Sequence, residues 1–295
     1  MNFLSPSGFS DYELIDCGDF QKLERFGKFL TIRPEPQALW KPEMPMSRWE
    51  KQAHVKFIPK SSSSGTWKKL KEMPDRWQVQ YLLKDQDFSK SIHFRLGLTS
   101  FKHVGIFPEQ AVNWGYIFRA VRTLKSRQKE VKVLNLFAYT GGASLAAAAA
   151  GATVFHLDSI RQVVNWANDN MKLSGISDIR WIVEDALKFA NRELKRGHRY
   201  QGIIMDPPAF GHGPNGEKWK LEDQIFELVE STLGILSKEN SFLILNAYSL
   251  GLSSLVIENL LKNFAGKKLE TGELFLPSSS GQKLPLGVFG RFLMT

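Results

Sequence analysis

The sequence lacks the features of a secreted or membrane-spanning protein. It contains one cysteine, Cys17, which cannot form an internal disulfide and therefore favours a reducing compartment. No apolar run approaches the roughly 18 residues that a membrane span needs. The first residues, MNFLSPSGFSDYEL, lack both the charged and the continuous apolar part of a secretory signal. We therefore expect a cytoplasmic protein with no membrane association.

Acidic residues are fewer than basic ones. The chain has 295 residues, with 39 Lys and Arg against 30 Asp and Glu, which gives a net charge of +9. This balance favours a polyanionic partner, nucleic acid first, although solubility alone also explains a basic surface. A hydrophobic content of 43% indicates a globular protein, and the length allows one large domain or two modest ones.

The first hundred residues are predicted to be rich in β-strands. The segment KFLTIRP is a candidate strand that ends at Pro34, and the Pro-, Ser- and Lys-rich stretch 33–74 is typical of a loop or linker. Two alternating segments follow, WQVQYLL and SIHFRLGL, joined by KDQDFSK. Their alternation predicts a hairpin with one packed face. The residues of that face are Trp77, Val79, Tyr81, Leu83, Ile92, Phe94, Leu96 and Leu98.

From residue 106 onward, strand and helix patterns alternate. A helix is expected from Pro108, because proline suits the first helical turn, where its missing N–H would be unpaired anyway. The alternation predicts an α/β fold with a Rossmann-like, doubly wound, mostly parallel sheet covered by helices on both faces. The tail, KKLETGELFLP and PLGVFGRFLM, predicts an antiparallel C-terminal hairpin that completes a seven-stranded sheet. We divide the chain into a smaller β-rich N-terminal domain, 1–105, and the α/β domain, 106–295.

A glycine turn follows the first strand of the α/β domain. Gly141 and Gly142, in AYTGGASL, let the chain turn sharply and approach a ligand closely. Asp158 and Asp185 stand at the ends of the next two strands, where a carboxylate can accept hydrogen bonds from ribose hydroxyls or an adenine amino group. The dinucleotide fingerprint requires a third glycine, which TGGASL lacks. The turn therefore favours S-adenosylmethionine, which has no phosphate, over NAD.

These segments resemble the motif series of class I S-adenosylmethionine-dependent methyltransferases. The resemblance rests on NLFAYTGGASL, LDSIRQVVNWANDN, EDA and MDPPAF, which occur in the family's order over about residues 103–250. More narrowly, the motifs resemble the bacterial group that methylates large-subunit ribosomal RNA on cytosine carbon-5 or guanine N7. By that resemblance Asp158 would bind ribose, Asp185 would face adenine, and four residues would surround the methionyl end: Phe137, Thr140, Gly141 and Gly142. Asn170 also matches a recurrent asparagine of the group.

The strand IIMDPPAF ends in an aspartate, two prolines and an aromatic ring. Methyl transfer from a sulfonium is an in-line displacement, so the protein must mainly hold the nucleophile on axis. Pro207 pushes Asp206 into extended geometry, which aims its carboxylate at one point and lets it hold the amino edge of a base. Phe210 could stack on the face of that base, and Asn246 could add a contact. The base would have to be unpaired or flipped.

The target atom is predicted from what the site lacks. Relatives that methylate cytosine carbon-5 attack the ring with a cysteine, and neither MDPPAF nor FLILNAYS contains one. We therefore expect a purine nitrogen, either guanine N7 or an exocyclic amine with Asp206 as acceptor. The segment FPEQA also departs from the resembled pattern, since Ala111 stands where an arginine is expected. That departure removes any arginine contact at this position.

Two other functions remain open. Asp-Pro-Pro acceptors would also orient a side-chain amide or amine, as in a protein methyltransferase, and a decayed enzyme fold would leave a non-catalytic RNA-binding protein. We expect RNA, ribosomal RNA first, as the partner of a monomer that needs no metal. The N-terminal region 1–105 would then supply substrate recognition through its exposed Lys, Arg and Trp residues.

Overall fold

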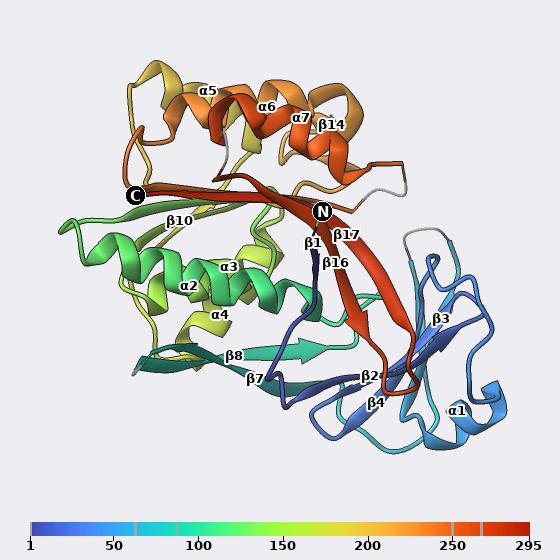
Figure 1. Cartoon of the computed structure of the whole chain (residues 1–295). Helices are drawn as coiled ribbons and strands as arrows, with labels where there is room; N and C mark the ends of the chain where they lie inside the picture. Colours follow the sequence, from blue (N-terminus) through green and yellow to red (C-terminus); the bar gives the residue numbers. More distant parts are fainter. Residues whose placement is uncertain (1, 62–63, 87, 249–250, 266–267) are drawn as a thin grey trace.

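The structure is a computed structural model that describes residues 2–61, 64–86, 88–248, 251–265 and 268–295. Its centre is an eight-stranded sheet in the order β1-β16-β17-β15-β12-β9-β10-β11 (Figure 1). The strands are β1 (Asn2–Leu4), β9 (Lys132–Leu136), β10 (Thr153–Asp158), β11 (Ile179–Val183), β12 (Gly202–Met205), β15 (Ser241–Ala247), β16 (Glu270–Pro277) and β17 (Lys283–Met294). The doubly wound sheet is confirmed, with β1 as an eighth strand.

The pairing of these strands is mostly parallel. Five neighbouring strands are parallel to one another, in the spatial order β11, β10, β9, β12 and β15. Only β17 runs against its neighbours, β15 and β16, so the antiparallel C-terminal hairpin is also confirmed. The edge beyond the hairpin is covered by β1, which pairs parallel with β16 at Asn2, Phe3 and Leu4. Three residues carry too little pattern to predict a strand.

Helices cover both faces of the sheet, as Figure 1 shows. One layer contains α5 (Ala186–Lys195), α6 (Leu221–Ile235) and α7 (Ser254–Ala265); the other contains α2 (Ala111–Lys125), α3 (Gly142–Ala149) and α4 (Arg161–Leu173). A 3₁₀ turn, η1 (Pro108–Gln110), precedes α2, so the helical segment begins at Pro108 as predicted. Within the described residues, no helix is both long enough and apolar enough to cross a bilayer.

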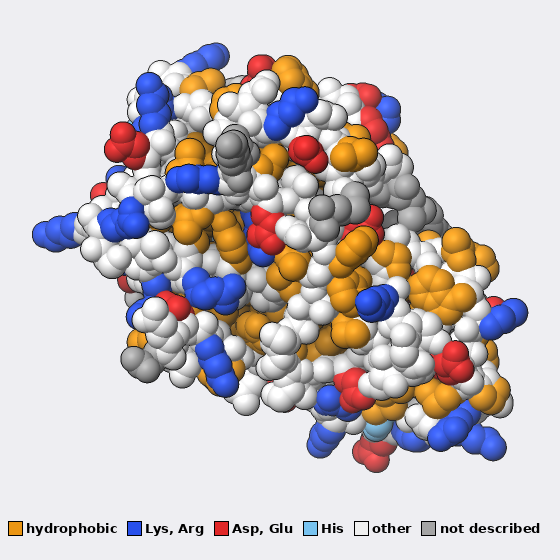
Figure 2. Space-filling model, in the orientation of Figure 1, with side chains coloured by type: hydrophobic (Ala, Val, Ile, Leu, Met, Phe, Trp, Pro, Cys, Tyr) orange, Lys and Arg blue, Asp and Glu red, His pale blue; other side chains and the backbone are white. Residues whose placement is uncertain are grey.

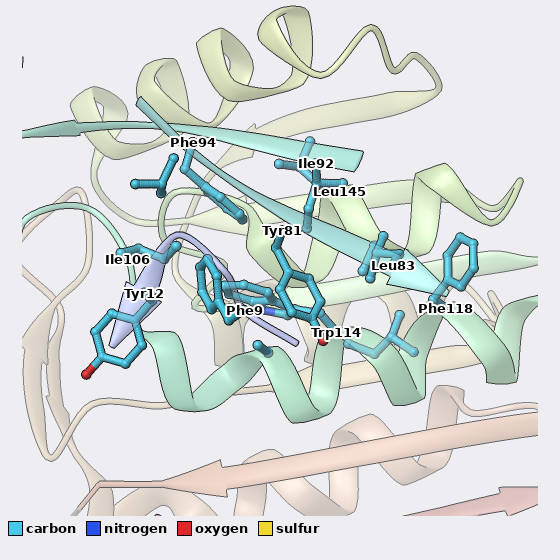
Figure 3. Close-up of a cluster of buried hydrophobic side chains, with 14 of the residues drawn as sticks. Phe9, Tyr12, Tyr81, Leu83, Ile92, Phe94, Ile106, Trp114, Phe118 and Leu145 are labelled. Carbon is cyan, nitrogen blue, oxygen red and sulfur yellow. The ribbon is translucent and has the colours of Figure 1, made fainter. Parts of the chain in front are cut away.

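The predicted hairpin is formed by β7 (Arg76–Asp85) and β8 (Phe88–Gly97). Its apolar face lies under α2, where Trp114 contacts the rings of Tyr81 and Phe94 at centroid distances of 5.6 and 5.1 Å (Figure 3). Phe9, from the start of the chain, joins the same cluster. The hairpin therefore forms a further layer beneath the helices, within the core of the sheet domain. The boundary near residue 105 stays a prediction.

The stretch 33–74 is not a linker. It contains α1 (Met46–Gln52), β5 (Val55–Pro59) and β6 (Gly65–Lys69). The last two complete a five-stranded sheet with β2 (Tyr12–Gly18), β3 (Gln21–Phe26) and β4 (Phe29–Pro34), in the order β2-β3-β4-β5-β6. Trp49 of α1 is fully buried and donates its indole N–H to Asp16. The composition of this stretch is loop-like, but tertiary pairing makes it a structured part of the N-terminal sheet.

Candidate active site

The parallel strands end at one edge of the sheet, and their register places the candidate residues side by side. Met205 pairs with Leu136 on one side and with Leu245 on the other. The next residue of each strand is therefore Phe137, Asp206 or Asn246, in adjacent positions. Asp158 ends β10 next to β9, and its register partner is Val183 of β11. These strand ends therefore lie at one edge of the sheet, as the sequence predicted.

The turn after β9 has an unusual backbone. Phe137 and Tyr139 have φ angles of 55° and 47°, and Gly141 has φ 94°. Positive φ costs a non-glycine residue free energy, and such residues gather at ligand-binding turns. A Cβ on Gly142 would lie 2.6 Å from Cε2 of Trp114, so only glycine allows α2 to approach the turn this closely.

Hydrogen bonds to α4, to β10 and to the backbone at Gly105 hold this turn in place. Asn170 of α4 donates its amide to the carbonyl of Thr140 at 3.0 Å, and its own oxygen accepts from the backbone of β8. The Thr140 hydroxyl donates to the carbonyl of Gly105 at 2.7 Å. The backbone N–H of Tyr139 donates to Asp158 at 3.0 Å. Asn170, which the sequence marked without a role, is therefore a support of the glycine turn.

A pocket opens beside the turn. Six predicted site residues line it: Phe137, Thr140, Gly141, Gly142, Asp206 and Asn246. Further lining residues come from β8, from α2, and from η1 and the residues just before it, among them Phe94, Asn113, Trp114, Phe107 and Gln110. Among the described residues of the lining, none is Lys, Arg or His. Such a lining suits a ligand without phosphate groups.

Asp206 is the charged group of this pocket. Its Oδ1 is buried and has no hydrogen-bond partner among the described residues. Burial, reinforced by the charge of Glu109, raises the pKa of the Asp206 carboxyl to about 7. An unpaired buried acceptor is costly to a folded protein, and an active site is where such a group is kept.

Asp158 and Asp185 lie outside the lining of this pocket and already have backbone partners. Asp158 accepts from Tyr139 and from Ile160, both at 3.0 Å, and burial raises its pKa. Asp185 caps α5 by accepting from the N–H of Lys188 at 2.8 Å. A second hollow lies between them, lined by Ser159, Arg161, Val183, Glu184, Lys188, Pro214 and Asn215. The ribose and adenine contacts of these two aspartates stay predictions.

Pro207 and Phe210 are also outside the pocket lining. Phe210 is 69% exposed in β13 (Phe210–His212), which pairs with β14 (Lys218–Lys220). Trp219 of β14 donates its indole N–H to the carbonyl of Pro208 at 2.6 Å and packs on Phe137. The small β13–β14 hairpin thus braces the Asp-Pro-Pro corner. Stacking of a base on Phe210 stays a prediction.

Sequence reasoning missed a chain of hydrogen-bonded polar side chains beside Asp206. Asn113 donates to Gln110 at 2.9 Å and to Asn246 at 3.0 Å, and Gln110 donates to the hydroxyl of Tyr248 at 2.7 Å. Glu109, which is 2% exposed, hydrogen-bonds to Tyr248, and burial raises its pKa. The segment FPEQAVN carries this signal, since three polar residues around a helix start, Glu109, Gln110 and Asn113, are unusual in a buried segment.

Comparisons with known proteins agree with this geometry. The family described as S-adenosylmethionine-dependent methyltransferase matches residues 76–221. A solved S-adenosylmethionine-dependent methyltransferase from Agrobacterium tumefaciens is 37% identical, with a TM-score of 0.90, and the alignment covers 99% of this chain and 93% of that one. This chain belongs to the S-adenosylmethionine-dependent methyltransferases. The methyltransferase fold is shared with a putative enzyme from Streptococcus mutans, at TM-score 0.68 and 17% identity over 97% of this chain and 76% of that one.

Curated relatives of the methyltransferase match a shorter region. The Ribosomal RNA large subunit methyltransferase K/L of Shewanella frigidimarina is 30% identical over 157 residues, which is 52% of this chain and 21% of that protein. Its counterpart from Syntrophotalea carbinolica is 30% identical over 160 residues, 53% of this chain and 20% of that protein. The methyltransferase therefore spans about a fifth of the length of these relatives.

The chemistry of the pocket lining suits S-adenosylmethionine, the cofactor of this methyltransferase family. When bound, that cofactor supplies a methyl group already activated by a positively charged sulfur. The pocket offers one unpaired carboxylate oxygen, polar amides and the backbone of the glycine turn, and no cation among its described lining residues. Thr140, Gly141 and Gly142 would hold the methionyl end, and Asp158 would hold the ribose.

Proposed function

We propose that this methyltransferase transfers a methyl group to a purine nitrogen of ribosomal RNA. The observation that carries the proposal is the unpaired Asp206 oxygen, which lies beside Asn246 at the tip of the sheet and lines the same pocket as the glycine turn. A carboxylate that accepts from an amino edge fixes a flat base in one orientation. The names of the curated relatives support RNA as the substrate class.

Cysteine chemistry does not support the alternative target, cytosine carbon-5. Cys17 is buried in β2 and is absent from the pocket lining. Burial raises the pKa of its thiol to about 11, which disfavours the thiolate that such an attack needs. Guanine N7 carries a free lone pair, and an exocyclic amine needs only an acceptor for its N–H. Asp206 serves either target as an acceptor.

RNA recognition is assigned to the N-terminal region together with the exposed ring of Phe210. The basic residues of α1, β5 and β6 include Arg48, Lys51, Lys56, Lys68 and Lys69. On the face shown in Figure 2, Lys and Arg side chains are spread widely rather than gathered in one patch. Contact with RNA on that face would therefore involve several dispersed phosphate contacts.

The test uses pure protein, methyl-labelled S-adenosylmethionine and two acceptors, deproteinised large-subunit ribosomal RNA and ribosomal protein. We expect label in RNA, with digestion giving a methylated purine. Label in protein alone would support the protein methyltransferase alternative instead. Calorimetry with S-adenosylmethionine provides the control for the non-catalytic alternative, since a protein that binds no cofactor cannot be the enzyme proposed.

A further inference from the structure

The polar chain of the pocket is continuous from Arg291 in β17 to Glu109 in η1. Arg291 donates to the Asn113 oxygen at 3.2 Å, and Asn113 donates to Gln110 and to Asn246. Gln110 donates to Tyr248, which hydrogen-bonds to Glu109. Each hydrogen bond along the chain is donated in the same direction. The chain begins at Arg291, which can only donate, and ends at the carboxylate of Glu109.

Arg291 is a buried anchor for this chain. It is 7% exposed, its Nε donates to Glu270 at 2.7 Å, and its guanidinium lies 4.3 Å from the centre of the Tyr116 ring. A guanidinium has no acceptor, so Asn113 must turn its oxygen toward Arg291 and its amino group toward the pocket side. Gln110 and Asn246 must then turn their oxygens toward Asn113. Their amino groups consequently face away from it.

Two N–H donors follow from this orientation. Gln110 uses one of its amide hydrogens on Tyr248, and Asn246 makes only a long contact of 3.5 Å to Gln110. Among the described residues, nothing takes up the second N–H of either amide. Both residues line the pocket, and Asn246 is adjacent to Asp206, whose Oδ1 is a free acceptor. The wall beside Asp206 therefore presents donors next to an acceptor.

We infer that Arg291 is a positioning residue that sets substrate specificity by fixing the orientation of the Gln110 and Asn246 amides. With that orientation, the site matches a ligand edge that places an acceptor, such as a carbonyl oxygen or a ring nitrogen, beside an N–H. Without it, both amides can rotate and set oxygens beside the Asp206 carboxylate, which repels the same edge. This inference rests on the proposed function, because it takes the ligand to be an RNA base.

The experiment compares Arg291→Gln with Arg291→Lys. Glutamine offers an oxygen as well as an amino group, so it releases the orientation, whereas lysine can only donate. We expect Arg291→Gln to raise the KM for deproteinised ribosomal RNA at least tenfold, with affinity for S-adenosylmethionine within threefold of wild type. Arg291→Lys should recover most of that loss. Asn246→Asp, which keeps the acceptor for Asn113 but removes the free donor, should reproduce the KM increase.

Arg122→Gln is the matched control. Arg122 also donates its Nε to a carboxylate, Asp85, and lies over a ring, Phe88, at 4.6 Å, but it is remote from the polar chain. Arg122→Gln should lower stability less than Arg291→Gln, because Arg122 is more exposed, and it should leave the KM for RNA unchanged. The inference would be overturned if Arg291→Gln and Arg291→Lys raised the KM for RNA equally. It would also be overturned if only the affinity for the cofactor fell. A wild-type protein that labels no RNA would instead defeat the proposed function.

Discussion

The N-terminal sheet and the carboxyl edge of the central sheet bury charge in opposite ways. In the N-terminal sheet, the Glu24 carboxylate accepts from Tyr12 at 2.9 Å and from Arg33 at 2.8 and 2.9 Å, and Lys22 lies 3.6 Å away. Burial alone would raise the pKa of Glu24, but Arg33 and Lys22 outweigh it and the net shift is downward. At the carboxyl edge, Asp206 has an unpaired oxygen and a raised pKa.

We propose that this difference separates a structural charge cluster from a catalytic one. A buried carboxylate with all its partners holds elements together, whereas one left without a partner has a free acceptor to offer a ligand. The comparison predicts that substitutions in the two regions affect different measurements. Substitutions in the N-terminal sheet should lower the free energy of unfolding, whereas substitutions at the carboxyl edge should lower turnover.

The largest expected effect is on turnover. Asp206→Ala removes the acceptor that we propose holds the base and should abolish methyl transfer. The proposed cofactor contacts of the glycine turn are unchanged, so affinity for S-adenosylmethionine should stay within a few-fold. Single-turnover assays and calorimetry on the same preparation check both parts. Intact turnover would remove Asp206 from the mechanism.

The next largest effect is on stability. Glu24→Ala leaves Arg33 and Lys22 buried without their main partner and should lower the free energy of unfolding by about 3–5 kcal/mol. Denaturant unfolding measures this loss. The control is Glu50→Ala, which breaks the exposed pair between Glu50 and Lys56 and should cost less than about 1 kcal/mol. Similar losses in the two variants would contradict the structural role of the Glu24 cluster.

Phe210→Ala should weaken RNA binding without affecting the cofactor. Stacking of one base on an aromatic ring contributes about 1–3 kcal/mol, so the dissociation constant should rise roughly five- to 150-fold. Because Phe210 is 69% exposed, its removal should change the free energy of unfolding little. The exposed Phe226 of α6 provides the comparison, since Phe226→Ala should leave RNA affinity unchanged. An equal loss in both variants would indicate non-specific apolar contact.

The pH dependence should follow the Asp206 carboxyl. Its pKa of about 7 lies above the ordinary value of 3.8, so the folded protein takes up this proton at higher pH than the unfolded chain. Turnover should fall as the pH drops through about 7, because the protonated acid loses acceptor capacity. The contribution of this group to stability should increase over the same range. A pH–rate profile for wild type without a change near 7 would contradict this assignment.

The α/β domain was predictable because its signals are local in sequence. A strand, a turn and an acidic strand end occupy a few consecutive residues, so the positions of Gly141, Asp158 and Asp206 could be placed before the structure was known. In the N-terminal sheet, the β-rich character and the strand β4 were predictable, but β5 was not, since β5 pairs with β4 only at Thr31 with Val55 and Ile32 with Lys56. Short strands of that kind depend on tertiary contacts rather than on pattern.

The polar chain was out of reach for the same reason. Asn113 meets Asn246 across 133 residues and Arg291 across 178 residues of sequence. Nothing local in the final strand, PLGVFGRFLM, distinguishes an arginine that orients amides from one that faces solvent. Asp158 and Asp185 show the converse, because their positions were predictable while their backbone partners were not.

The most direct measurement is thermal unfolding of Asp206→Asn at pH 8. If Asp206 is retained for function against its desolvation cost, the neutral isostere should raise stability by about 2 kcal/mol, since one pKa unit corresponds to about 1.4 kcal/mol and the amide still leaves a polar atom unpaired. The account predicts a higher melting temperature together with slower methyl transfer, because an amide oxygen is a weaker acceptor than a carboxylate. A lower melting temperature would show that the carboxylate is paired and structural, as Glu24 is, and would contradict it.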